Sequence, residues 1–247
     1  MKFKDIYAAI NYLKNRKEIN ANLLGVIGHS EGGLIAPMLA IKSEDVKFIV
    51  LLAGPGLRGD KILVLQSELI QEANNVNENE IKKVLELSRK IYDVLLSETD
   101  SLKAAKKLTG ILEQQYNELN ESEKESTGDK QEFIVNKLEI LLNPWFNYFV
   151  NYDPYPTLTK IKIPVLALNG EKDLQVPAKD NLNEIEKALN EAGNKSFKVI
   201  ELPGLNHLFQ KCETGSPIEY GRIEETFSPE AMKIIIDWIN VLNIEQN

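Results

Sequence analysis

Short apolar runs alternate along the chain with longer segments whose apolar residues recur at helical spacing. Four runs are brief, rich in Val, Ile and Leu, and bounded by turn residues, a pattern that predicts buried parallel strands. The predicted strands are residues 23–28, 47–52, 164–169 and 197–202. The helical spacing predicts helices at 5–16, 31–42, 61–73, 78–96, 100–118, 129–142, 180–192 and from 228 onward.

Capping residues and one proline add detail to these helices. Asp5 is the expected N-cap of the first helix, and Ser228 the expected N-cap of the last, with Pro229 at its first helical position. Pro37 falls inside the helix predicted at 31–42. Because proline lacks an N–H donor and clashes with the preceding turn, we expect a kink or a late start there.

The order of the elements predicts the domain organisation. Strands separated by helices are typical of a parallel α/β sheet with helices on both faces, a three-layer core. Residues 59–158 are helical throughout and rich in Glu, Lys, Asn and Leu. We therefore expect residues 1–58 and 159–247 to form the core, and 59–158 to form a helical insertion between the second and third strands.

Composition excludes several classes of protein. The 247 residues are 43% hydrophobic, which is enough for a folded core, and the net charge of −8 disfavours binding to nucleic-acid phosphates. No run of about 18 apolar residues predicts a membrane span, and charges interrupt any secretory signal in the first twenty residues. Cys212 is the single cysteine, so neither a disulfide framework nor a cysteine zinc site is expected. A cytoplasmic location fits, although the compartment stays open.

The sequence Gly28-His29-Ser30-Glu31-Gly32 is a G-x-S-x-G motif between a predicted strand and a predicted helix. This context is the one in which the motif presents a nucleophilic serine on a sharp turn. Small residues at 28 and 32 would let the backbone turn tightly, and the amide of Glu31 would stabilise an oxyanion. The alternative is a glycine-rich turn with an incidental serine.

A serine nucleophile needs a base, and the chain has two histidines. His29 adjoins Ser30, and we expect its side chain to point away and pack beneath the turn. His207 lies in a loop after the last predicted strand, at the carboxyl edge that also carries Ser30. We therefore predict His207 as the base, the alternative being an exposed polar residue.

The base needs a carboxylate to orient it. Asp173 follows the third predicted strand at the same edge and is the first choice, although it could simply form the turn before Val176. Glu171 and Asp60 are the alternatives. The chain order serine, aspartate, histidine matches one known arrangement of the catalytic triad.

Three segments carry a resemblance to a known family: GVIGHSEGGLIAPMLA, IPVLALNGEKDLQVP and ELPGLNHLFQ. In this order they resemble the α/β-hydrolase superfamily, in particular its esterase and serine-aminopeptidase-like branch. The resemblance implies a hydrolase core with a helical lid at 59–158, an acyl-enzyme on Ser30, proton transfer by His207 and orientation of His207 by Asp173. It implies an ester substrate, or alternatively a peptide or amide, and no metal or organic cofactor.

The chain departs from this family before residue 28, where one helix stands in place of several strands. The loop that supplies the family's second oxyanion donor has no counterpart, and the first strand would become an apolar sheet edge, which favours self-association. Three explanations stay open: the carboxyl portion of a longer enzyme, a short form that forms a homo-oligomer through this edge, or a non-catalytic remnant that acts by interaction.

An aromatic group precedes the third predicted strand. Trp145, Phe146 and Phe149 either pack the insertion against the core or form an apolar wall that receives an acyl or alkyl group above Ser30. They are the candidate substrate-pocket residues.

Overall fold

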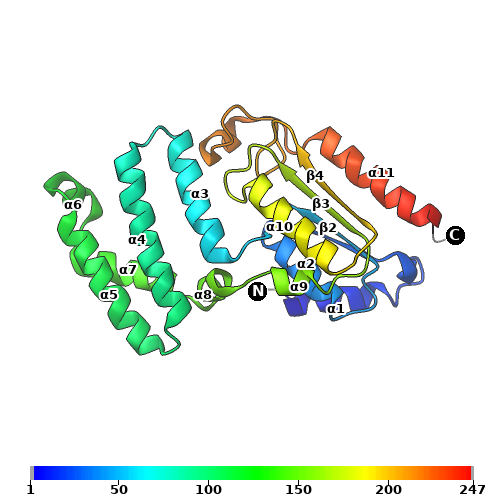
Figure 1. Ribbon diagram of the computed structural model, residues 1–247, viewed down its shortest axis with the longest axis horizontal. Helices are drawn as coiled ribbons and strands as arrows, with labels where there is room; N and C mark the ends of the chain where they lie inside the picture. The colour runs from blue at the N-terminus through cyan, green and yellow to red at the C-terminus, as the bar shows by residue number, and fades with distance from the viewer. Residues whose placement is uncertain (1–2, 246–247) are drawn as a thin grey trace.

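The computed structural model describes residues 3–245 and contains one four-stranded parallel sheet (Figure 1). The strands lie side by side in the order in which they occur along the chain. They are β1 (Gly25–His29), β2 (Phe48–Leu52), β3 (Val165–Gly170) and β4 (Phe197–Leu202). The predicted α/β class with a parallel sheet is confirmed.

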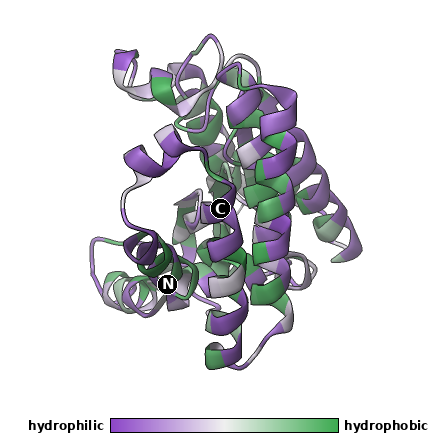
Figure 2. Ribbon diagram, turned by 90° about the vertical axis from the view of Figure 1, so that its left-hand side faces the viewer, coloured by the Kyte–Doolittle hydropathy of each residue, from purple (hydrophilic) through white to green (hydrophobic). Residues whose placement is uncertain are grey.

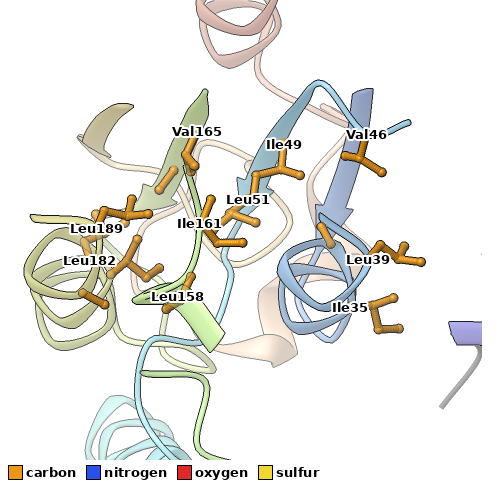
Figure 3. Packing of buried hydrophobic residues seen from close by; sticks show 14 of the residues in the cluster. Ile35, Leu39, Val46, Ile49, Leu51, Leu158, Ile161, Val165, Leu182 and Leu189 are labelled. Carbon is orange, nitrogen blue, oxygen red and sulfur yellow. The ribbon is translucent and has the colours of Figure 1, made fainter. Parts of the chain in front are cut away.

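Helices cover both faces of this sheet, which gives the three layers. On one face a hydrophobic cluster joins β2 and β3 to α1, α2, α9 and α10; Leu39 and Leu182 extend into it from α2 and α10 (Figure 3). On the other face α11 packs through Trp238, whose ring lies edge-on to Phe48 with 5.8 Å between the ring centroids. The bounds of these helices are α1 (Phe3–Leu13), α2 (Gly32–Ala40), α9 (Tyr155–Leu158), α10 (Ala178–Glu191) and α11 (Pro229–Glu245).

The two central strands and the edge strand β1 differ in burial. Every residue of β2 and β3 is buried, whereas Gly25, Ile27 and His29 of β1 are exposed. Val26 packs into the cluster of α1 and α2, but the cluster beneath α11 includes no β1 residue of the described chain. One face of β1 is therefore bare, and the side chain of Ile27 is left 52% exposed.

Between β2 and β3 the chain forms a group of helices on one side of the sheet (Figure 1). Most of them share a hydrophobic cluster of their own, and Figure 2 shows that the long helices carry both hydrophobic and hydrophilic residues. No helix within residues 3–245 is long and apolar enough to cross a membrane. The group consists of α3 (Gly59–Ala73), α4 (Glu78–Ser97), α5 (Ser101–Glu118), α6 (Glu121–Thr127), α7 (Lys130–Leu141) and α8 (Pro144–Asn151), followed by the short α9.

Two predictions about the helix ends and interiors are wrong. Asp5 is not an N-cap, because α1 already begins at Phe3 and Asp5 lies in its first turn. Pro37 does not delay α2, which begins at Gly32 and continues through Pro37 to Ala40, so the expected late start is wrong and the kink stays a prediction. The dense packing of α2 against the sheet keeps the helix intact, since every residue from 33 to 39 is buried.

Candidate active site

Ser30 occupies a sharp turn between β1 and α2. Its φ of 54° lies in the left-handed region, which non-glycine residues adopt only where the surroundings hold them there. Two hydrogen bonds hold this turn: the Ser30 N–H donates to the Leu52 carbonyl at 2.9 Å, and the Gly33 N–H donates to the Ser30 carbonyl at 2.8 Å. This is the strand–turn–helix context that the motif requires.

Glycine is needed at Gly28 and Gly33 but not at Gly32. A Cβ at residue 28 would lie 2.1 Å from the Gly32 carbonyl oxygen, and one at residue 33 would lie 2.5 Å from the Cα of Gly54. A Cβ at Gly32 would meet nothing within 4 Å. The prediction of a steric need at both 28 and 32 is therefore correct for the first position only, because α2 approaches the chain after β2 at Gly33 instead.

His207 and Asp173 form a buried pair. His207 Nδ1 lies 2.8 Å from Asp173 Oδ2, and the two residues are only 5% and 2% exposed. The other carboxylate oxygen accepts the backbone N–H groups of Gln175 and Val176, each at 2.8 Å. Because a carboxylate can only accept, Nδ1 carries the proton and Nε2 of the neutral ring is left free to act as a base.

The loops that carry this pair are joined by further hydrogen bonds. Glu171 Oε2 accepts the Gly204 N–H at 2.8 Å, and the Lys172 N–H donates to the Leu205 carbonyl at 2.9 Å. Glu171 therefore connects the two loops and is not the partner of His207. Asp60, the other alternative, pairs with Arg58 at 2.5 and 2.9 Å.

The sequence led us to expect that His29 packs beneath the turn, and this prediction is wrong. Its Nε2 lies 2.8 Å from the His207 carbonyl oxygen, and the two imidazole centroids are 4.8 Å apart. Within the described chain the Ser30 hydroxyl makes no hydrogen bond to His207, and the hydrogen bond of His29 joins the serine turn to the loop of the predicted base.

The helical group touches the core at two points near these residues. Trp145 Nε1 donates to Glu31 Oε1 at 2.9 Å, and Ser216 Oγ donates to Asn74 Oδ1 at 2.9 Å. Trp145 stacks on Phe149 with 5.7 Å between ring centroids. Phe146 instead packs into the cluster of the helical group. Of the three candidate aromatic residues, Trp145 and its stacked partner are the ones joined to the serine turn.

Tyr220 stands near the acidic end of the pair. Burial raises the pKa of Tyr220 to about 12, and the negative charge of Asp173 contributes to the increase. The phenol therefore stays protonated at neutral pH. It accepts a hydrogen bond from Gln175 Nε2 at 3.1 Å, and Gln175 also donates its backbone N–H to Asp173. Sequence reasoning missed this tyrosine, because no local pattern connects η2 (Pro217–Arg222) with the aspartate loop.

A polar cavity of about 350 Å³ lies elsewhere, between the segment after β2 and α10. Its lining mixes basic and acidic side chains, and it includes none of Ser30, Asp173 and His207. The lining residues are Gly56, Leu57, Arg58, Lys61, Asp153, Tyr155, Glu184, Lys187 and Glu191. Among the residues that the structure describes, no group of three or more His, Cys, Asp or Glu side chains is arranged to hold a metal ion.

Comparison with known proteins shows what the chain is similar to. Residues 6–112 match the family described as BAAT / acyl-CoA thioester hydrolase C terminal. This match, which covers less than half of the chain, confirms the resemblance to the α/β-hydrolase superfamily. No curated protein matches the chain.

Solved structures of similar fold are distant in sequence. An esterase of Pyrococcus furiosus is 14% identical, with 82% of this chain and 53% of that chain covered and a TM-score of 0.42. A carboxylesterase of Nitrososphaera gargenis is 15% identical, with 99% and 74% covered and a TM-score of 0.45. A monoacylglycerol lipase of Paleococcus ferrophilus is 17% identical, with 96% and 73% covered and a TM-score of 0.45. The chain thus spans about half the length of the Pyrococcus protein.

Proposed function

We propose that the protein is a serine hydrolase that cleaves small or medium carboxylic esters through an acyl-enzyme on Ser30. The observation that carries this proposal is the buried 2.8 Å pair of Asp173 and His207 at the sheet edge where Ser30 holds its positive φ. A nucleophile on a strained turn and a base oriented by a carboxylate are the groups that acyl transfer requires.

In this mechanism Ser30 Oγ attacks the acyl carbon while His207 Nε2 takes the hydroxyl proton. Asp173 stabilises the imidazolium that forms and keeps Nδ1 protonated. The bond between the acyl carbon and the leaving oxygen then breaks, and His207 returns its proton to the departing alcohol. Water attacks the acyl-enzyme with His207 again as the base, which releases the acid and restores Ser30.

The N–H of Glu31 would stabilise the oxyanion. It stands at the start of α2 and donates to no group of the described chain, which supports this role. We identify no second donor. Because one missing donor costs about 2.7–4 kcal/mol, we expect an activity about 10²–10³ below that of an enzyme with both donors.

We further propose that residues 59–158 act as a lid. The hydrogen bond from Trp145 to Glu31 supports this role, because it joins α8 to the residue that follows the nucleophile. The stacked rings of Trp145 and Phe149 would provide an apolar wall for the acyl or alkyl group.

Other substrates and one other function remain as alternatives. The family match includes acyl-CoA thioester hydrolases in its description, which is a specific reason to test acyl thioesters. A peptide or amide substrate would use the same three residues. A non-catalytic protein that acts by interaction is the alternative from another class, since only one oxyanion donor is identified.

A fluorophosphonate probe tests the proposal directly. We expect covalent labelling of the parent protein and none of the Ser30→Ala variant; absence of labelling in both would refute a catalytic serine. Hydrolysis of p-nitrophenyl esters, acyl thioesters and aminoacyl-nitroanilides would then distinguish the three substrate classes. Faster turnover of the nitroanilides at matched concentration would contradict the ester assignment.

We also propose that the protein forms a homo-oligomer through β1. The exposed residues Gly25 and Ile27 on a strand with one neighbour in the described sheet support this proposal. Light scattering should show self-association that Ile27→Lys abolishes. A monomer at high concentration would contradict it.

A further inference from the structure

The strongest unassigned contact near the site is made by His29, the residue before the proposed nucleophile. His29 lies on the face of β1 that α11 leaves uncovered, and its Nε2 approaches the His207 carbonyl oxygen to 2.8 Å. The two residues are 178 positions apart in the chain. A carbonyl oxygen can only accept, so His29 Nε2 carries the hydrogen and donates it.

Among the residues that the structure describes, His29 is the one donor to this carbonyl. No backbone or other side-chain donor of the described chain bonds the His207 carbonyl oxygen. Since His207 is only 5% exposed, loss of the imidazole would leave a carbonyl in a largely buried residue without a protein partner. A buried carbonyl that loses its donor has a free-energy reason to rotate toward water, and rotation there would move the His207 ring.

The other bonds in this loop hold different atoms. Asp173 holds the Nδ1 of the His207 ring. Asn206 Oδ1 accepts the N–H groups of Leu208 and Gln210 at 2.9 and 3.0 Å, which fixes the backbone after His207. Each of these partners belongs to the carboxyl half of the chain. Within residues 3–245, His29 alone joins the base to the strand that carries the nucleophile by a hydrogen bond.

The contact between the two rings adds a second constraint. Their centroids lie 4.8 Å apart at an interplanar angle of 47°, and His29 also lies 6.3 Å from the ring of Phe209. Phe209 is fully buried, and its N–H donates to the Asn206 carbonyl at 3.0 Å, so the ring against which His29 packs has a fixed backbone. His29 thus contacts both the backbone and the ring of His207.

We propose that His29 is a positioning residue that sets the distance between Ser30 Oγ and His207 Nε2 by holding the backbone of the base against the nucleophile strand. This inference rests on the proposed function for its catalytic consequence. Proton transfer is sensitive to such a distance, because a displacement of about 1 Å can cost about 100-fold in rate. His29 itself exchanges no proton with the substrate in this role.

Three variants separate the hydrogen bond from the bulk of the side chain. His29→Gln keeps an N–H donor that can reach the same carbonyl, whereas His29→Phe keeps an aromatic ring without a donor. Ile236→Ala changes an exposed apolar side chain of α11, away from β1 and from the proposed site, and serves as the control. The concentration dependence of fluorophosphonate labelling yields a rate constant at saturating probe and a half-saturating concentration for each protein.

We expect His29→Phe to lower the saturated labelling rate by about 10- to 100-fold with the half-saturating concentration unchanged. His29→Gln should stay within about threefold of the parent, since it restores the donor to the carbonyl. Ile236→Ala should label like the parent. Parent-like labelling of His29→Phe would overturn the inference, as would a loss in His29→Gln equal to that in His29→Phe.

Hydrogen exchange keeps the inference testable if the parent itself does not label, a result that would refute the proposed function. Peptides covering residues 203–210 should exchange faster in His29→Phe than in the parent, and at the parent rate in His29→Gln. Unchanged exchange of this loop in His29→Phe would overturn the positioning role independently of catalysis.

Discussion

Gly170, the last residue of β3, determines how closely the two loops of the Asp173–His207 pair approach one another. A Cβ at this position would lie 2.2 Å from the Leu205 carbonyl oxygen and 2.7 Å from that of Asn206, and both are backbone atoms. An ordinary carbon–oxygen contact is about 3.3 Å, so Gly170→Ala must displace the loop by about 1 Å. That displacement would stretch the 2.8 Å bond between Asp173 and His207.

The expected cost of Gly170→Ala follows from this displacement. A misplacement of about 1 Å costs about 100-fold in rate, or about 2.7 kcal/mol of transition-state stabilisation. Overpacking should also lower the free energy of unfolding by about 1–3 kcal/mol. Labelling by a fluorophosphonate and denaturant unfolding measure the two effects.

Gly110→Ala is the matched control for this substitution. Its Cβ would meet nothing within 4 Å, and Gly110 is an exposed residue inside α5. We expect a gain of about 0.5–1 kcal/mol in unfolding free energy from the better helix propensity and no change in labelling. Unchanged labelling of a folded Gly170→Ala protein would refute the argument that glycine sets the approach of the two loops.

Three further predictions concern the site and its surroundings. Asp173→Asn should lower ester turnover by about 10⁴-fold by favouring the wrong tautomer of His207, and a steady-state assay would measure it. Trp145→Phe loses the hydrogen bond to Glu31 and should lower the equilibrium constant for lid closure by about 2- to 12-fold. Hydrogen exchange of α8 should then be faster, and unchanged exchange would contradict this prediction. Desolvation by burial lowers the pKa of His29. Because the unfolded chain then binds a proton that the folded imidazole does not, the free energy of unfolding should fall as pH drops below about 6.5. Thermal melts should show a smaller fall in His29→Gln.

The strands could be predicted closely because their burial dominates the local pattern. The prediction of 197–202 agrees with β4, and the strands predicted at 47–52 and 164–169 are each displaced by one residue at one or both ends. Parallel strands buried on both faces are continuous apolar runs, which turn residues end abruptly. Helix ends were harder to predict; α8 was missed, although Asn143 caps it and Pro144 occupies its first turn.

The sequence could predict those site residues whose place depends on the end of a strand. It could not predict those whose place depends on contacts between distant segments. The end of a parallel strand places a residue at the catalytic edge, so Asp173 and His207 could be named from the sequence. Whether Glu171 or Asp173 meets the histidine depends on how the two loops dock. The orientation of His29 depends on the bare face of β1 and on a carbonyl 178 residues away, which no local pattern encodes.

The placement of Ser30 has a mechanical consequence. Ser30 follows β1, an edge strand of the described sheet, which pairs on one side with β2 and, in residues 3–245, has no helix packed over one of its faces. Local unfolding of β1 from β2 would therefore displace Ser30 while the central strands and the Asp173–His207 pair stayed folded. A molecule that pairs with the free edge of β1 would therefore also raise the fraction of time in which Ser30 Oγ occupies its position in the site.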